Sequence, residues 1–198
     1  MEENKLNGQI SDESVAPSDT KEEETETPEY VPTGKYEKVL YSLYKNETYY
    51  EMLKVTSYAI AAITVYAFFM MLMGCFEEAR YLDIAKILAV TGVPFIVVSV
   101  IRHLINAPRP YELLPFYEKK PKHKSGRSFP SRHVFSIFVI GTVLLIDSPI
   151  LGAGILVLGV LLAALRVLLG LHFIRDVIAG AAIGAVSGII GILIISFT

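Results

Sequence analysis

Long apolar runs separated by short polar breaks dominate the chain from residue 55 to its end. A membrane-spanning helix needs about twenty mostly apolar residues. Five segments approach that length: residues 55–76, 83–101, 133–146, 150–165 and 177–197. The runs are apolar on all faces instead of along one stripe, which disfavours a soluble helical core. The pattern therefore predicts an all-α, polytopic membrane helix bundle of about five spans.

Glycines in the last of these runs follow a helical spacing. Gly180, Gly184 and Gly188 recur every four residues, so they lie on one face of the predicted helix. Small residues spaced in this way allow two helices to pack closely. We expect this face to pack inside a single bundle and not to form a dimer contact.

Residues 35–54 differ from the spans that follow, because tyrosines and leucines alternate with lysines and glutamates. A spanning helix here would bury Lys45, Glu47 and Glu51 in lipid. The composition suits an amphipathic helix that lies in the headgroup layer. We therefore expect an interfacial N-terminal helix at 35–54, before a membrane domain at 55–198.

The first 34 residues form a third, strongly acidic region. They contain ten Asp or Glu and two Lys, a net charge of −8, whereas the rest of the chain carries a net charge of +6. Few apolar residues and high charge prevent a segment from burying enough surface to fold. We expect a disordered acidic tail at 1–34.

Charged and polar residues stand in or beside the apolar segments, where they are costly and so mark function. With five antiparallel spans, the 102–132 connection and the 166–176 turn lie on the same membrane face. Three fragments would then meet there: Arg102-x6-Arg109-Pro110, Pro130-Ser131-Arg132-His133 and Arg166-x5-His172-x3-Asp176.

The arginines and the serine of these fragments suit an anion. Arg109 lies between two prolines, and a guanidinium group matches phosphate oxygens through two hydrogen bonds. Arg166 follows sixteen apolar residues and needs an anionic partner, which could be phosphate, Asp176 or a helix end. Ser131 could cap a helix, or could help an open helix N-terminus to bind phosphate.

His172 and Asp176 are four residues apart, so on one helix they would share a face. A carboxylate that holds Nδ1–H leaves Nε2 free for nucleophilic attack. A metal site is the alternative, but no third ligand completes it, so we expect neither a metal nor another cofactor. His133 remains as a proton donor to a leaving oxygen. Together with the arginines, these groups favour phosphoryl transfer.

The three fragments resemble the signature motifs of the type-2 phosphatidic acid phosphatase superfamily, which read Lys-x6-Arg-Pro, Pro-Ser-Gly-His and Ser-Arg-x5-His-x3-Asp. The likeness covers residues 84–190, and the family commonly has six core spans. Three positions depart from the motifs: Arg102 replaces Lys, Arg132 replaces Gly, and Leu165 replaces Ser. The resemblance implies that His172 is the nucleophile, Asp176 the orienting carboxylate and His133 the acid–base residue. It also implies four phosphate-binding residues: Arg102, Arg109, Ser131 and Arg166.

The resemblance also implies a metal-independent membrane phosphatase that hydrolyses a lipid phosphomonoester or lipid pyrophosphate through a phosphohistidine. Its candidate substrates are phosphatidic acid, phosphatidylglycerophosphate and undecaprenyl pyrophosphate. Two alternatives stay open: a phosphatase of a soluble phosphate ester, resembling glucose-6-phosphatase, and a non-catalytic lipid-phosphate-binding protein in which Arg132 blocks turnover. The expected partners are a lipid phosphate and membrane lipids, and not nucleic acid, since no soluble domain presents the basic residues.

The side of the cell membrane that carries the site is a separate question for this multi-pass chain. Basic residues near short loops favour the cytoplasmic face, and the 35–54 and 102–132 segments are both basic. Members of the resembled family commonly act on lipid phosphates at the outer or lumenal face. We follow the resemblance and expect an extracytoplasmic active site.

Overall fold

A computed structural model describes residues 30–117 and 125–197. Most of the predicted acidic tail lies outside these residues, as does the lysine-rich part of the long connection. All regular structure within the described ranges is helical, which confirms the all-α prediction. The elements are α1 (Lys35–Lys45), α2 (Glu47–Glu77), α3 (Tyr81–Ile105), α4 (Pro110–Leu113), a 3-10 turn η1 (Pro115–Tyr117), α5 (Arg132–Asp147), α6 (Pro149–Leu168) and α7 (Ile174–Phe197).

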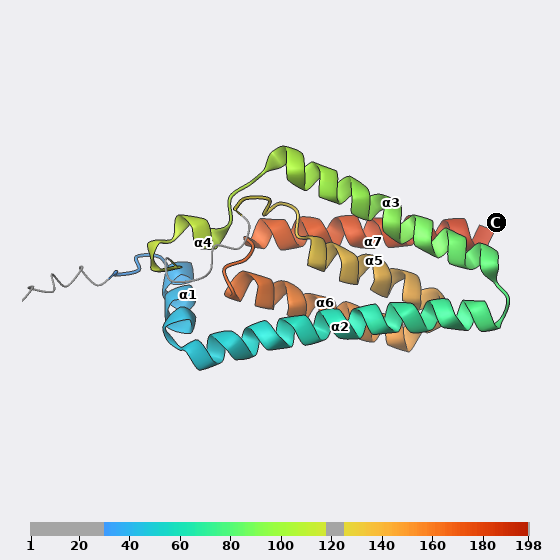
Figure 1. Ribbon diagram of the computed structural model, residues 1–198, viewed down its shortest axis with the longest axis horizontal. Helices are drawn as coiled ribbons and strands as arrows, with labels where there is room; N and C mark the ends of the chain where they lie inside the picture. Colours follow the sequence, from blue (N-terminus) through green and yellow to red (C-terminus); the bar gives the residue numbers. More distant parts are fainter. Residues whose placement is uncertain (1–29, 118–124, 198) are drawn as a thin grey trace, which may run out of the picture.

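Four segments in the described ranges are long and apolar enough to cross a membrane: Glu47–Glu77, Tyr81–Leu113 (which contains α3 and α4), Pro149–Leu168 and Ile174–Ile195. The fifth predicted span forms α5, which has 16 residues and so is about 24 Å long. It is the central helix, because Val134, Phe135 and Leu144 are fully buried against its neighbours. The prediction of a polytopic helical bundle is confirmed, with α5 as a short core helix between longer ones (Figure 1).

The N-terminal segment corrects the prediction of one interfacial helix over 35–54. The helix is interrupted at Asn46, and the Asn46 side chain accepts a hydrogen bond of 3.2 Å from the backbone N–H of Tyr49. An asparagine that caps a helix in this way starts a new helix. Residues 47–54 therefore belong to the long helix α2, and α1 alone lies across the end of the bundle (Figure 1), held by the fully buried Leu40.

The glycine face of α7 packs directly against the backbone of α5, as the spacing predicted. A Cβ atom on Gly180 would lie 2.6 Å from the carbonyl oxygen of Ser131. On Gly184 it would lie 2.5 Å from the carbonyl oxygen of Phe135. Real Cβ atoms do not approach backbone oxygens this closely, so only glycine permits the observed distance between the two helices.

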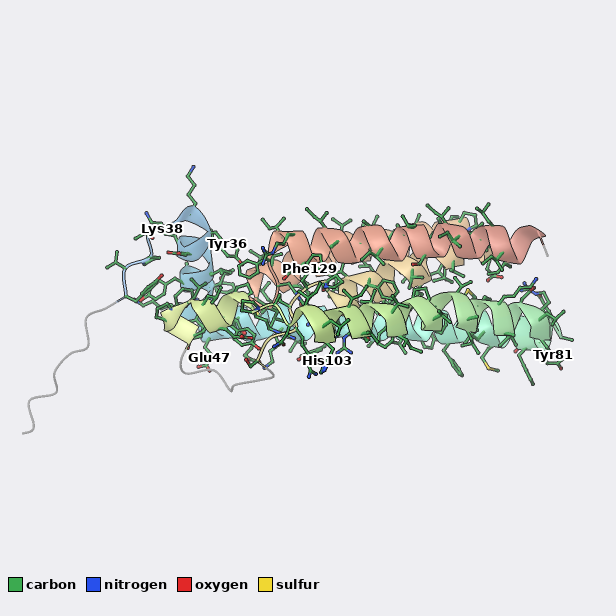
Figure 2. All side chains as sticks on the ribbon, turned by 90° about the horizontal axis from the view of Figure 1, so that it is seen from above. Tyr36, Lys38, Glu47, Tyr81, His103 and Phe129 are labelled. Carbon is green, nitrogen blue, oxygen red and sulfur yellow. The ribbon has the colours of Figure 1, made fainter. Side chains whose placement is uncertain are left out.

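The helix order brings the three polar fragments to one end of the bundle. α3 ends, α5 begins and the α6–α7 turn lies at this end. His103 and Phe129 both lie toward it, and Tyr81 lies at the opposite end (Figure 2). The opposite end carries a separate ionic cluster around Arg80, which contacts Glu78 at 2.7 Å and Asp147 at 3.5 Å. The fold therefore places the predicted chemistry at a single end.

Replacing Gly184 with alanine should destabilise the protein, because the new methyl group would collide with a backbone oxygen. We expect a loss of about 1–3 kcal/mol, which outweighs the helix propensity of alanine. Gly154→Ala in α6 is the matched control, since nothing lies within 4 Å of a Cβ there. Thermal unfolding in detergent should show a lower midpoint for Gly184→Ala and an unchanged or higher one for Gly154→Ala. Equal midpoints for the two variants would contradict the close helix contact.

Candidate active site

Arg102, near the C-terminal end of α3, fixes the segment that precedes α5. Its side chain is buried, with 4% exposed. Nη1 donates a hydrogen bond to the carbonyl oxygen of Ser128 at 3.1 Å and another to the carbonyl oxygen of Pro130. Arg102 therefore holds this backbone segment, and the phosphate binding that the motif resemblance implies for it stays a prediction.

Arg109 lies in the loop between α3 and α4 and is half-buried. Its Nε donates to the carbonyl oxygen of Gly126 at 3.1 Å, and its guanidinium lies 5.8 Å from the ring centre of Tyr111. The backbone N–H of Tyr111 donates to the carbonyl oxygen of Gly170 at 3.2 Å. Gly170 has a φ of +66°, a conformation that favours glycine. These contacts join the Arg109 loop to the α6–α7 turn.

Ser131 occupies the N-cap position of α5 without capping it. Its side chain is fully buried, and Oγ has no hydrogen-bond partner within residues 30–117 and 125–197. Its backbone N–H donates to the carbonyl oxygen of Asp176 at 2.9 Å. Of the two interpretations open from the sequence, this geometry favours a hydroxyl available to a ligand over a helix cap.

The two residues after Ser131 are less buried than Ser131 itself. His133 is exposed, and Arg132 is half-buried, with its guanidinium 5.8 Å from the ring centre of Phe95 in α3. A proton donor to a leaving group must reach the substrate from the open side of the site. The position of His133 is compatible with that function.

Arg166 lies in the last turn of α6 and is buried, with 5% exposed. Neither its Nε nor its Nη2 has a hydrogen-bond partner in the described part of the chain, and the ring centre of Tyr58 lies 6.0 Å away. The structure thus shows no pairing of this guanidinium with Asp176. The backbone carbonyl of Arg166 accepts from the N–H of His172 at 3.2 Å, so the same residue also holds the turn that carries His172.

His172 and Asp176 lie close together but not on one helix. α7 begins at Ile174, so His172 belongs to the preceding turn. Nδ1 of His172 lies 3.7 Å from Oδ2 of Asp176, and both side chains are buried. Oδ2 also accepts from the backbone N–H of Phe173 at 3.0 Å. Burial lowers the pKa of His172 below its ordinary 6.5, although the adjacent Asp176 carboxylate opposes that effect. A lowered pKa keeps the imidazole uncharged near neutral pH, as a nucleophile requires.

Ser128 is a site residue that the sequence analysis missed. It is fully buried, and its Oγ donates to Oδ2 of Asp176 and lies 3.4 Å from Nδ1 of His172. Its position two residues before the Pro130 fragment was the sole signal in the sequence. That signal is weak, because the contact joins residues 48 positions apart.

An open hollow of about 400 Å³ lies beside the α6–α7 turn, lined by Tyr36, Phe173, Ile174 and Arg175. Most of its lining is apolar, and the guanidinium of Arg175 lies 3.5 Å from the buried carboxylate of Asp176. Tyr36 comes from α1, so the N-terminal helix borders this hollow. The hollow therefore offers an apolar surface next to a cationic group.

The described residues contain no group of three or more His, Cys, Asp or Glu placed to hold a metal ion. The buried charged groups at this end of the described structure are the guanidinium groups of Arg102 and Arg166 and the carboxylate of Asp176, beside the imidazole of His172. Fixed cations beside a buried histidine are suited to binding an anion and stabilising charge that develops on it.

Comparisons with known proteins agree with this arrangement. No curated protein sequence matches the chain. Among solved structures, LpxE of Aquifex aeolicus is 26% identical with a TM-score of 0.58, and the match covers 78% of this chain and 93% of that one. A PAP2-type phosphatidylglycerolphosphate phosphatase of Bacillus subtilis, 21% identical, has the same fold, with a TM-score of 0.61 over 83% of this chain and 88% of that one. The sequence profile of the PAP2 superfamily matches residues 83–197, which confirms the resemblance seen in the motifs: the chain belongs to the PAP2 superfamily.

Proposed function

We propose that the protein is a metal-independent membrane phosphatase that hydrolyses a lipid phosphomonoester or lipid pyrophosphate through a phosphohistidine. One observation carries the proposal. Two guanidinium nitrogens of the buried Arg166 and the buried hydroxyl of Ser131 lack partners in the described structure, close to the turn that holds His172. Unpaired buried donors are costly, so such a set is retained where it binds an acceptor-rich ligand. A phosphate group supplies those acceptors.

The residues divide the reaction into two steps. In the first, Nε2 of His172 attacks phosphorus, the bond to the leaving oxygen breaks, and His133 gives that oxygen its proton. In the second, His133 takes a proton from water as the water oxygen attacks phosphorus, and the bond to Nε2 breaks. Arg109, Arg166 and Ser131 hold the phosphoryl oxygens throughout. Fixed donors around the transferring group stabilise its charge without reorganisation.

A lipid substrate fits this site better than a soluble ester. The site lies at the end of a bundle whose long helices are apolar enough to cross a membrane. The hollow bordered by Tyr36 and Phe173 places an apolar surface next to the catalytic turn. The structural relative from Bacillus subtilis is itself named as a phosphatase of a phospholipid. These observations support a substrate with a phosphate head and an apolar tail.

We also propose that the active-site end faces away from the cytoplasm, in a multi-pass protein of the cell membrane. Lipid phosphates are presented to members of this family at that face. The arginines at this end are used by the site, so their presence does not report on membrane insertion alone. This orientation places α1 outside and the ionic cluster around Arg80 inside.

Purified protein should release phosphate from vesicles that contain phosphatidic acid, phosphatidylglycerophosphate or undecaprenyl pyrophosphate. His172→Ala should lower kcat by at least about 10³-fold, because the nucleophile is lost, and Asp176→Asn should lower it less. His103→Ala is the matched control, since this exposed histidine of α3 has no function in the proposed reaction. Release by His172→Ala at the wild-type rate would rule out the phosphohistidine. Lipid-phosphate binding without release by the wild-type protein would indicate a binding protein instead.

Activity should persist after chelation with excess EDTA and dialysis, because the guanidinium groups replace a metal ion as the source of positive charge. Orthovanadate should inhibit, since it adopts the trigonal-bipyramidal geometry of the phosphoryl group during transfer. Both are measured as phosphate release from the same vesicles. Complete loss of activity that one divalent ion restores would show that the reaction depends on a metal.

Cysteine labelling can locate the active-site end. The chain has a single cysteine, Cys75, which is buried, and Cys75→Ala provides a background without thiols. In that background, Lys38→Cys in α1 should react with a membrane-impermeant maleimide in intact cells, because Lys38 is exposed at the active-site end. Glu77→Cys, exposed at the opposite end, should react after the membrane is opened. The reverse pattern would place the site in the cytoplasm.

A further inference from the structure

The distance between His172 and Asp176 leaves the orientation of the histidine unexplained. Nδ1 and Oδ2 are 3.7 Å apart, and a separation of about 3.6 Å or more is too long for a hydrogen bond. The carboxylate oxygen is already engaged by the N–H of Phe173 and the hydroxyl of Ser128. A direct carboxylate–imidazole bond is therefore not what holds the ring in this structure.

The hydroxyl of Ser128 lies against both groups. Its Oγ contacts Oδ2 of Asp176 and lies 3.4 Å from Nδ1 of His172. A carboxylate oxygen only accepts, so the single hydroxyl hydrogen of Ser128 points to Asp176. The hydroxyl then presents lone pairs to the imidazole. A hydrogen on Nδ1 is the arrangement that satisfies this contact.

The backbone of Ser128 is fixed at two points. Its N–H donates to the carbonyl oxygen of Ala107 at 2.9 Å, and its carbonyl oxygen accepts from Nη1 of Arg102 at 3.1 Å. The side chain has no exposed surface. Ser128 therefore connects the Arg102–Arg109 loop to the turn that carries His172, and its hydroxyl has little freedom to point elsewhere.

Ser128 and Ser131 differ in what their hydroxyls contact, although three positions separate them. Both side chains are fully buried. The hydroxyl of Ser128 is engaged with Asp176, whereas that of Ser131 has no partner among the described residues. This contrast separates a residue that serves the nucleophile from one available to the substrate.

We propose that Ser128 is a positioning residue that links Asp176 to His172 and holds the imidazole as the Nδ1–H tautomer, with Nε2 free to attack. The kinetic consequences rest on the proposed phosphatase function, whereas the tautomer does not. Removing the hydroxyl should lower kcat with little change in KM, because substrate binding is untouched. Removing the hydroxyl of Ser131 should instead raise KM and weaken vanadate binding.

Kinetics on lipid vesicles test the link. Ser128→Ala should lower kcat roughly 10- to 100-fold, the effect of losing a hydrogen bond to a charged group. In the Asp176→Asn background, Ser128→Ala should add little, since residues that act as a unit are not additive. Ser128→Thr, which keeps the hydroxyl, should recover part of the rate if it melts at the wild-type temperature. A wild-type kcat in Ser128→Ala, or full multiplication with Asp176→Asn, would contradict the proposal.

Nitrogen-15 NMR tests the tautomer without any need for activity. The chain has four histidines, so His172→Ala identifies the His172 signals by difference. In wild-type protein we expect a protonated Nδ1 and an unprotonated Nε2 at neutral pH, and in Ser128→Ala a mixture of tautomers. A wild-type Nε2–H tautomer would overturn the inference even in an active enzyme. The expected tautomer in a protein that hydrolyses none of the lipids would leave the inference standing and refute the proposed function.

Discussion

The close contact between the backbones of α5 and α7 is the constraint on which the site depends. Gly180 and Gly184 lie against the main-chain oxygens of Ser131 and Phe135, and Gly188 lies against the side chain of Thr142. The contact also fixes their register, because the N–H of Ser131 meets the carbonyl oxygen of Asp176 at 2.9 Å. A bulkier residue at Gly180 would push the start of α5 away from Asp176. The position of Asp176 relative to the start of α5 is therefore set by the packing of the two helices.

The two buried arginines, Arg102 and Arg166, differ in the hydrogen-bond partners of their guanidinium groups. Main-chain carbonyl oxygens accept hydrogen bonds from part of the Arg102 guanidinium. These bonds offset the cost of burying the charge and hold the loop before α5. Arg166 lacks such partners at Nε and Nη2, so its burial is an energetic cost that an anionic ligand would relieve. One buried arginine, Arg102, therefore binds the backbone, and the other, Arg166, keeps donors that have no partner among the described residues.

Much of this arrangement could be predicted from the sequence, because it follows from the order of apolar segments and from motif spacing. Antiparallel helices bring the three fragments to one end wherever the exact helix ends fall. Side-chain contacts between distant segments could not be predicted in the same way. Ser128 meets Asp176 across 48 positions, and no local pattern encodes that contact.

The break at Asn46 was missed for a different reason: a single capping hydrogen bond overrides the continuous amphipathic pattern. The partners of Arg102 likewise depend on where the chain passes, and not on residue type. The prediction that His172 and Asp176 share one face of a helix was only partly right, because α7 starts two residues after the histidine.

The short α5 also sets how deep the chemistry lies. Its neighbours α2 and α3 have 31 and 25 residues, against 16 in α5. α5 is thus shorter than the helices around it, and the segment that leads into it is fully buried at Ser128 and Ser131. One helical turn is about 5.4 Å long, comparable to the size of a phosphate group. Under the proposed function, the length of this core helix fixes how far the headgroup of a lipid must enter the end of the bundle before it reaches His172.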